Sequence, residues 1–193
     1  MNPEAFNALV RSRRSTFPDQ LLAGGEVSDA IIHEILVNAT WAPNHGKQEP
    51  WRFTVFSGAG RNTFATFQSE LYKASAGENF KEATYQKLQQ NPLKASHIIA
   101  IVMKRTLVKN IPEVEDIEAV ACAVQNIYLS VTAYGLGGYW TTGGVTYNPA
   151  AKSFFGLEEA DKLLGFFYIG QVAVPSTGAT RAPLEEKVKW VKA

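Results

Sequence analysis

The chain has 193 residues, a formal net charge of +1 and a hydrophobic content of 46%. This length suits one domain, 1–193, and the nearly neutral charge argues against a basic nucleic-acid-binding surface or a general attraction to acidic membranes. No apolar run approaches the ~18 residues of a membrane span, and the first residues lack the layout of a signal peptide. The single cysteine, Cys122, cannot form an internal disulfide. We therefore expect a cytoplasmic protein.

The first part of the chain predicts two capped helices and a strand. Asn2 and Ser28 suit helix N-caps, and Pro3 suits the first helical position. Apolar residues recur with helical spacing after each cap. From Trp51 to Phe56 the side chains alternate in the way that is typical of a strand.

A polar loop joins the second helix to this strand. Pro43 ends the helix, residues 44–48 are polar or flexible, and Pro50 moves Glu49 out of the helical region. The loop is either a binding site for a planar polar ligand or an ordinary connection with prolines at its ends.

Residues 57–103 predict a helical excursion followed by a strand. A helix with one apolar face is expected after Gly60. Residues 73–95 are polar, with breaks expected at Gly77 and Pro92, and such surface segments often cover a site. The run of apolar, mostly β-branched residues at 97–103 indicates a buried strand.

The second half begins with the most hydrophobic helix, predicted from Val114 to Tyr134. Six successive apolar residues from Ala119 to Val124 indicate either the core of the monomer or a dimer interface. Cys122 lies in this run and is predicted to be a small buried packing residue.

A glycine-rich segment, 135–144, follows that helix. Its five glycines permit unusual backbone angles and bring bare amides close to a ligand. A short helix after Asn148, a buried strand at 165–174 and an edge strand at 186–191 complete the prediction. The edge strand could pair with the sheet of another chain.

The polar residues argue against two kinds of chemistry. The three histidines have no partner at metal-ligand spacing, so no metal site is predicted: His33, His45 and His97. The chain also lacks G-x-S-x-G and a Cys–His signature, so hydrolase chemistry is not expected.

Three segments remain as candidate binding elements: 13–15, 44–48 and 138–144. They offer guanidinium groups, side-chain donors and backbone amides. Four aromatic residues lie in or near them: Trp41, Trp51, Tyr139 and Trp140. This combination suits an aromatic ring system with a phosphate tail, such as flavin mononucleotide (FMN).

Over nearly its whole length the chain resembles the flavin-dependent nitroreductase family, in particular a compact branch with an A-P-x-H motif. The order and spacing of five motifs carry the resemblance. They are R-R-S at 13–15, A-P-N-H-G-K-Q-E-P-W-R-F at 42–53, G-L-G-G-Y-W-T-T-G at 135–143, G-F-F-Y-I-G at 165–170 and R-x-P-L-E-E at 181–186.

The resemblance implies an α+β nitroreductase-like fold, with a central mixed or antiparallel sheet flanked by helices. It also implies a homodimer that exchanges its C-terminal strands and holds FMN at the interface. Arg13, Arg14 and Ser15 would hold the phosphate and ribityl chain, with Arg181 as a second phosphate partner. Further residues are implied around the same cofactor: His45 from the other subunit, Trp41, and Trp140, Thr141 and Thr142 along the ring.

The implied activity is reduction of nitroaromatics, quinones or similar small molecules by NAD(P)H in a ping-pong cycle. The flavin N5 atom carries the chemistry, so no catalytic side chain is named. Two alternatives stay open: a flavin-storage or regulatory module, and another redox reaction on the same fold, such as reductive dehalogenation.

Two positions depart from the family pattern. Several branches carry Lys or Arg two residues after the R-x-S serine, near the pyrimidine edge of the flavin, and this chain has Phe17 there. Loss of that positive charge should lower the flavin reduction potential unless another donor substitutes. A basic residue can precede A-P in the compact branch, and here it is Trp41.

Overall fold

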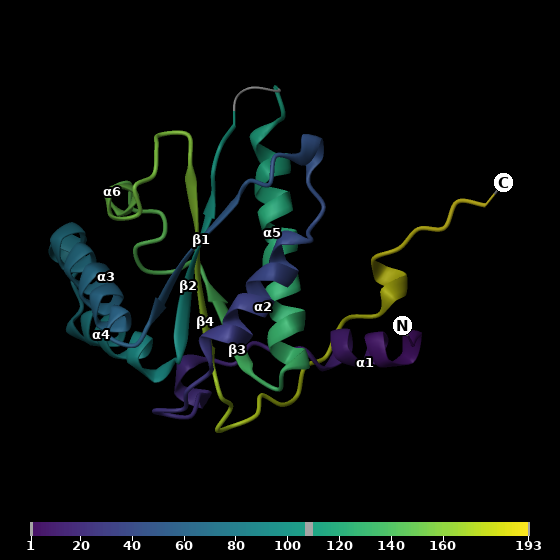
Figure 1. Cartoon of the computed structure of the whole chain (residues 1–193), viewed down its shortest axis with the longest axis horizontal. Helices are drawn as coiled ribbons and strands as arrows, with labels where there is room; N and C mark the ends of the chain where they lie inside the picture. Colours follow the sequence, from purple (N-terminus) through teal and green to yellow (C-terminus); the bar gives the residue numbers. More distant parts are fainter. Residues whose placement is uncertain (1, 107–109, 193) are drawn as a thin grey trace.

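A four-stranded antiparallel sheet forms the centre of the structure, a computed structural model that describes residues 2–106 and 110–192 (Figure 1). In sheet order the strands are β1 (Trp51–Ser57), β2 (His97–Met103), β4 (Lys162–Gly170) and β3 (Gly137–Thr141). Each neighbouring pair runs antiparallel. The predicted α+β class is confirmed, and of the two sheet types expected the antiparallel one is observed.

Helices cover both faces of this sheet (Figure 1). One face carries α2 (Asp29–Thr40) and α5 (Glu113–Ala133), and the other carries α3 (Gly60–Ala76), α4 (Glu82–Lys94) and α6 (Ala151–Phe154). Helix α1 (Pro3–Ser12) contacts α5. Four 3-10 turns complete the described elements: η1 (Pro18–Gln20), η2 (His45–Lys47), η3 (Gly77–Asn79) and η4 (Leu184–Glu186).

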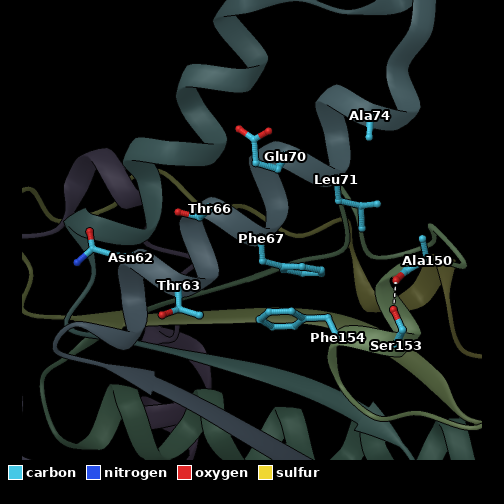
Figure 2. Close-up of a pocket in the computed structure, with 10 residues that line it drawn as sticks. All are labelled: Asn62, Thr63, Thr66, Phe67, Glu70, Leu71, Ala74, Ala150, Ser153 and Phe154. Atoms are coloured by element: carbon cyan, nitrogen blue, oxygen red, sulfur yellow. Dashed lines mark hydrogen bonds between the residues drawn. The ribbon is translucent and has the colours of Figure 1, made fainter.

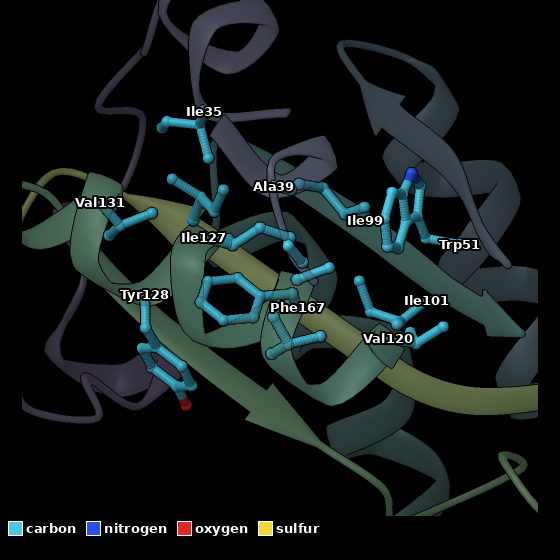
Figure 3. Close-up of a cluster of buried hydrophobic side chains, with 14 of the residues drawn as sticks. Ile35, Ala39, Trp51, Ile99, Ile101, Val120, Ile127, Tyr128, Val131 and Phe167 are labelled. Atoms are coloured by element: carbon cyan, nitrogen blue, oxygen red, sulfur yellow. The ribbon is translucent and has the colours of Figure 1, made fainter. Parts of the chain in front are cut away.

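Strand β2 connects the two halves of the hydrophobic core, because all of its residues are buried. Side chains alternate between the faces of a strand. Ile99 and Ile101 therefore join the cluster under α2 and α5, which Figure 3 shows, while Ile98 and Val102 join the cluster under α3. The apolar run of this strand thus reflects burial on both faces.

The predicted helix caps are confirmed. Asn2 Oδ1 accepts a hydrogen bond from Glu4 N at 2.8 Å, and Ser28 Oγ accepts one from Ile31 N at 3.4 Å. Each cap satisfies a backbone N–H that the first helical turn leaves without a partner.

The sequence predicts that Pro92 breaks the polar helical segment 73–95. This prediction is wrong, because Pro92 lies inside α4. Proline has no backbone N–H and therefore cannot bond the carbonyl of Leu88, four residues earlier. That carbonyl instead accepts a hydrogen bond from Gln68 Nε2 at 2.5 Å. A side chain of α3 thus compensates for the missing bond in α4.

The glycine-rich segment forms a strand, β3, which the sequence analysis did not predict. Gly137 and Gly138 are required by packing: a Cβ atom would lie 2.8 Å from Thr16 Cγ2 at Gly137 and 2.7 Å from a Phe167 ring carbon at Gly138. Both glycines therefore let neighbouring segments approach the strand closely. The strand predicted at 165–174 is also shifted, because β4 spans Lys162–Gly170.

Two other predictions fail within the single chain. Cys122 is exposed, because the buried face of α5 is formed by residues such as Ala119, Val120 and Ala123, and Cys122 lies on another face. Residues 187–192 form no strand. The tail extends away from the sheet, as Figure 1 shows.

Within the described ranges no helix has the length and apolar character needed to cross a membrane. The same ranges contain no cluster of three or more His, Cys, Asp or Glu side chains suited to a metal ion.

Candidate functional site

A cavity of about 460 Å³ brings together arginines from both ends of the chain. Arg13 and Arg14 follow the end of α1, and Arg181 comes from the C-terminal tail. The other lining residues are Val10, Arg11, Gln125 and Ala179. Four guanidinium groups without an acidic side chain among the lining residues suit a phosphate. The structure therefore unites three residues that the sequence analysis assigned to one phosphate.

Tyr128, in α5, connects this cavity to the glycine-rich strand. The guanidinium carbon of Arg13 lies 4.8 Å from the centre of the Tyr128 ring, within the range of a cation–π contact. The Tyr128 hydroxyl accepts a hydrogen bond from Trp140 N at 2.8 Å and lies 3.3 Å from Ser15 Oγ. Tyr128 is not among the predicted site residues, and its only signal in the sequence is a hydroxyl in the most apolar helix.

The segment after Arg14 runs along the outer edge of β3. Thr16 N donates to Gly138 O at 2.9 Å, and the ring centres of Phe17 and Tyr139 are 4.7 Å apart. The carbonyl of Gly138 and the amide of Trp140 both point away from β4, because the first accepts from Thr16 N and the second donates to the Tyr128 hydroxyl. By strand alternation the next outward amide is that of Thr142, an exposed residue just past the strand end.

A second cavity, of about 240 Å³, lies at the other end of this segment. Its walls come from the segment and β3 on one side and from α3 and α4 on the other: Pro18, Gln68, Thr84, Lys87, Leu88, Asn91, Tyr139, Thr141, Gly143, Gly144, Phe166 and Tyr168. Burial raises the pKa of Tyr168 far above its ordinary value of 10.0, so its hydroxyl stays protonated. The cavity is lined by both apolar and polar side chains, and Lys87 is the cation among them.

Trp41 and His45 lie apart from the arginine cavity. Trp41 is 82% exposed, and His45 Nδ1 lies 2.5 Å from Glu115 Oε2 in the first turn of α5. The arginines instead lie near Gln125 and Tyr128, farther along the same helix. Within one chain these two groups of predicted residues are not brought together.

The loop that carries His45 has a strained backbone. Lys47 and Glu49 have φ values of 55° and 47°, in the left-handed region that non-glycine residues rarely adopt. Gln48 Nε2 is buried without a hydrogen-bond partner among the described residues. Strain and an unsatisfied amide together are typical of a loop that binds something outside its own chain.

A groove of about 880 Å³ lies between α3 and α6, as Figure 2 shows. Phe67 and Phe154 stack in it with ring centres 3.8 Å apart. Glu70 is the charged side chain among its lining residues, and none of the predicted site residues lines it. The groove is therefore unsuited to a phosphate and is separate from the candidate site.

Comparison with known proteins relates the chain to one family. The profile described as "Nitroreductase family" matches residues 10–171. "Putative NAD(P)H nitroreductase YdjA" of Escherichia coli K12 is 29% identical over 152 residues, covering 79% of this chain and 81% of that protein.

Two solved structures extend this similarity to the fold. A nitroreductase-like family protein from Bacillus cereus superimposes with a TM-score of 0.82 at 26% identity, covering 100% of this chain and 99% of that one. A Desulfovibrio desulfuricans protein, described as a putative nitroreductase in complex with FMN, gives a TM-score of 0.70 at 25% identity, covering 100% and 98%.

Proposed function

The chain belongs to the nitroreductase family, and from this premise we propose that it is a homodimeric oxidoreductase that binds FMN and uses NAD(P)H. The observation that carries the proposal is the continuous path from the arginine cavity, past Tyr128, to the outer edge of β3. Names of relatives add support, since they include "Putative NAD(P)H nitroreductase YdjA" and a protein described as a putative nitroreductase in complex with FMN.

The residues along this path fit the chemical parts of FMN in order. Arg13, Arg14 and Arg181 would hold the phosphate, and Ser15 would bond the ribityl chain. The amide of Thr142 would donate at the edge of the ring. When bound, FMN supplies two-electron transfer from NAD(P)H to an electron-poor small molecule such as a nitroaromatic or a quinone, in a ping-pong cycle.

The chain's own contribution is then to bind and orient. The Tyr128 hydroxyl contacts both Ser15 and the Trp140 amide. It would therefore fix the position of the phosphate-binding segment relative to the strand beside the flavin ring. The indole Nε1 of Trp140 donates to Leu164 O at 3.0 Å, which anchors that side chain to β4. These contacts organise the site in advance, and this reduces the entropy lost on binding.

A second subunit would complete the site. His45 and Gln48 lie on a loop that does not reach the arginine cavity of its own chain, so we assign them to the FMN of the partner. Exposed apolar surface supports association: a groove of about 640 Å³ lies between α1 and α5, and Phe6 beside it is 46% exposed. In the extended tail, Trp190 is 78% exposed and would pack on the partner.

The first experiment is the visible spectrum of the purified protein, followed by anaerobic addition of NADH and NADPH. Flavin bands that bleach rapidly are expected. Flavin that stays oxidised with both donors would contradict the NAD(P)H assignment and favour a storage or regulatory module. A protein that takes up no added FMN would refute the proposed function itself.

The variant Arg13→Ala tests the phosphate assignment. A charge-assisted contact to phosphate is worth about 1.5–3 kcal/mol, so FMN affinity should fall by roughly 10- to 150-fold. Fluorescence titration of FMN measures the change. Lys73→Ala, which removes an exposed cation from α3, is the matched control and should bind as the parent does.

A further inference from the structure

Phe17 presents an apolar ring beside β3, and the cavity at the end of this strand contains a cation. Phe17 packs on Tyr139 with ring centres 4.7 Å apart and offers no charge. Pro18 and Tyr139 both line the 240 Å³ cavity, and so does Lys87 of α4. A positive group therefore approaches the same place from a different element.

The path of the chain places the ring end of FMN near this cavity. The arginine cavity includes Arg13, and the second cavity includes Pro18, five residues later. Residues 13–17 form no helix, and five extended residues span at most roughly 18 Å. A mononucleotide with its phosphate at the arginines and its ring along β3 would thus end at the cavity that contains Lys87.

Several other polar groups in or near the cavity have partners of their own. Lys94 forms a short ion pair with Asp19, and Gln68 Nε2 donates to Leu88 O. Asn91 Oδ1 lies 3.3 Å from Lys94 Nζ. Among the described residues Lys87 forms neither an ion pair nor a side-chain hydrogen bond, so its ammonium group is available to a ligand.

The charge of Lys87 also acts on Asp19. The hydrogen bond and the charge of Lys94 lower the pKa of Asp19, and the charge of Lys87 lowers it further. Asp19 directly follows Pro18, which lines the cavity.

We propose that Lys87 supplies the positive charge at the ring end of FMN and thereby raises the reduction potential of the bound cofactor. This inference rests on the proposed function. Two-electron reduction leaves negative charge on the pyrimidine side of the ring, and a nearby ammonium group stabilises that charge. Lys87 is therefore a tuning residue on α4, within the polar helical segment predicted at 73–95.

The test is the reduction potential of bound FMN, measured by anaerobic equilibration with reference dyes. Lys87→Gln should weaken binding of reduced FMN about tenfold relative to oxidised FMN. For a two-electron couple, that change lowers the potential by about 30 mV. Lys87→Arg should retain the parental potential because it keeps the charge. Lys81→Gln removes a cation from the N-cap of α4, outside the cavity, and should leave the potential unchanged.

Three results would overturn the inference. The reduction potential of FMN bound to Lys87→Gln could equal that of FMN bound to the parent, or it could change by no more than the potential of FMN bound to Lys81→Gln. Alternatively, Lys87→Gln could weaken binding of oxidised FMN without changing the potential, which would place another part of the ligand at Lys87. Each differs from failure of the proposed function, which would appear as a parent protein that binds no FMN.

Discussion

At the scale of single residues, Tyr128 does more than its place in an apolar helix indicates. Its ring packs against Phe167 with centres 4.6 Å apart, and the Arg13 guanidinium lies over it. Its hydroxyl satisfies the amide of Trp140 at the outer edge of β3. One side chain thus joins the core, the arginine cavity and the edge strand.

Tyr128→Phe separates these roles, because it keeps the ring and removes the hydroxyl. The Trp140 amide and Ser15 then lose a partner. An unsatisfied buried donor costs about 1–3 kcal/mol, and the free energy of unfolding should fall by that amount, with weaker FMN binding. Urea denaturation and FMN titration measure the two effects. Tyr147→Phe, at a tyrosine that is 74% exposed, should change neither.

At the scale of elements, Asp161 joins the end of β2 to the start of β4. Its side chain is almost fully buried and accepts hydrogen bonds from Arg105 N at 2.9 Å, Glu158 N at 2.9 Å and Lys104 Nζ at 3.0 Å. Burial alone would raise the pKa of Asp161, but these hydrogen bonds outweigh it and hold the pKa below the ordinary value of 3.8. The ionised form is therefore the one that stabilises the fold.

The lowered pKa of Asp161 predicts how the stability of the fold changes in acid. A carboxylate with a lowered folded-state pKa contributes stability above its unfolded pKa, and that contribution is lost as the pH falls through the folded-state pKa. The parent should therefore lose stability below about pH 4, whereas Asp161→Asn should lose less over the same interval and be less stable at pH 7. Urea midpoints between pH 2.5 and pH 7 measure this. Parallel curves for the two proteins would contradict the assignment.

At the scale of the whole molecule, the proposed site is divided between two chains. Arg13 lies beside Tyr128 on α5, and His45 lies beside Glu115, several turns nearer the start of the same helix. A two-fold dimer could bring the His45 of one chain to the arginine cavity of the other. The extended tail, with exposed Leu184 and Trp190, would cross the same interface.

Subunit complementation tests this division. In a heterodimer of Arg13→Ala and His45→Ala chains, one of the two sites regains both native residues. Random mixing of equal amounts makes about half of the dimers heterodimers, so roughly a quarter of the parental activity should return. Mass spectrometry verifies the exchange of subunits. Absence of recovery after verified exchange would show that Arg13 and His45 do not share a site.

Local signals in the sequence determined the caps at Asn2 and Ser28, the strands β1 and β2, and the long helix α5, because these depend on residues that are close in the chain. The motifs also predicted the family and assigned Arg13, Arg14 and Arg181 to one ligand. Tertiary packing decided the rest. Position 137 in β3 requires glycine because Thr16 packs against it, and Gln68 bonds the carbonyl that Pro92 leaves free within α4.

Tertiary structure alone also revealed Tyr128 and Lys87. Each lies beside residues that are distant in sequence, and the sequence alone does not specify which distant segments meet. The sequence by itself therefore determined the class of fold and the chemical groups available for binding, through propensities and spacings of neighbouring residues. Only the tertiary structure decided which of those groups face one cavity, because that depends on how helices and strands pack across the sheet.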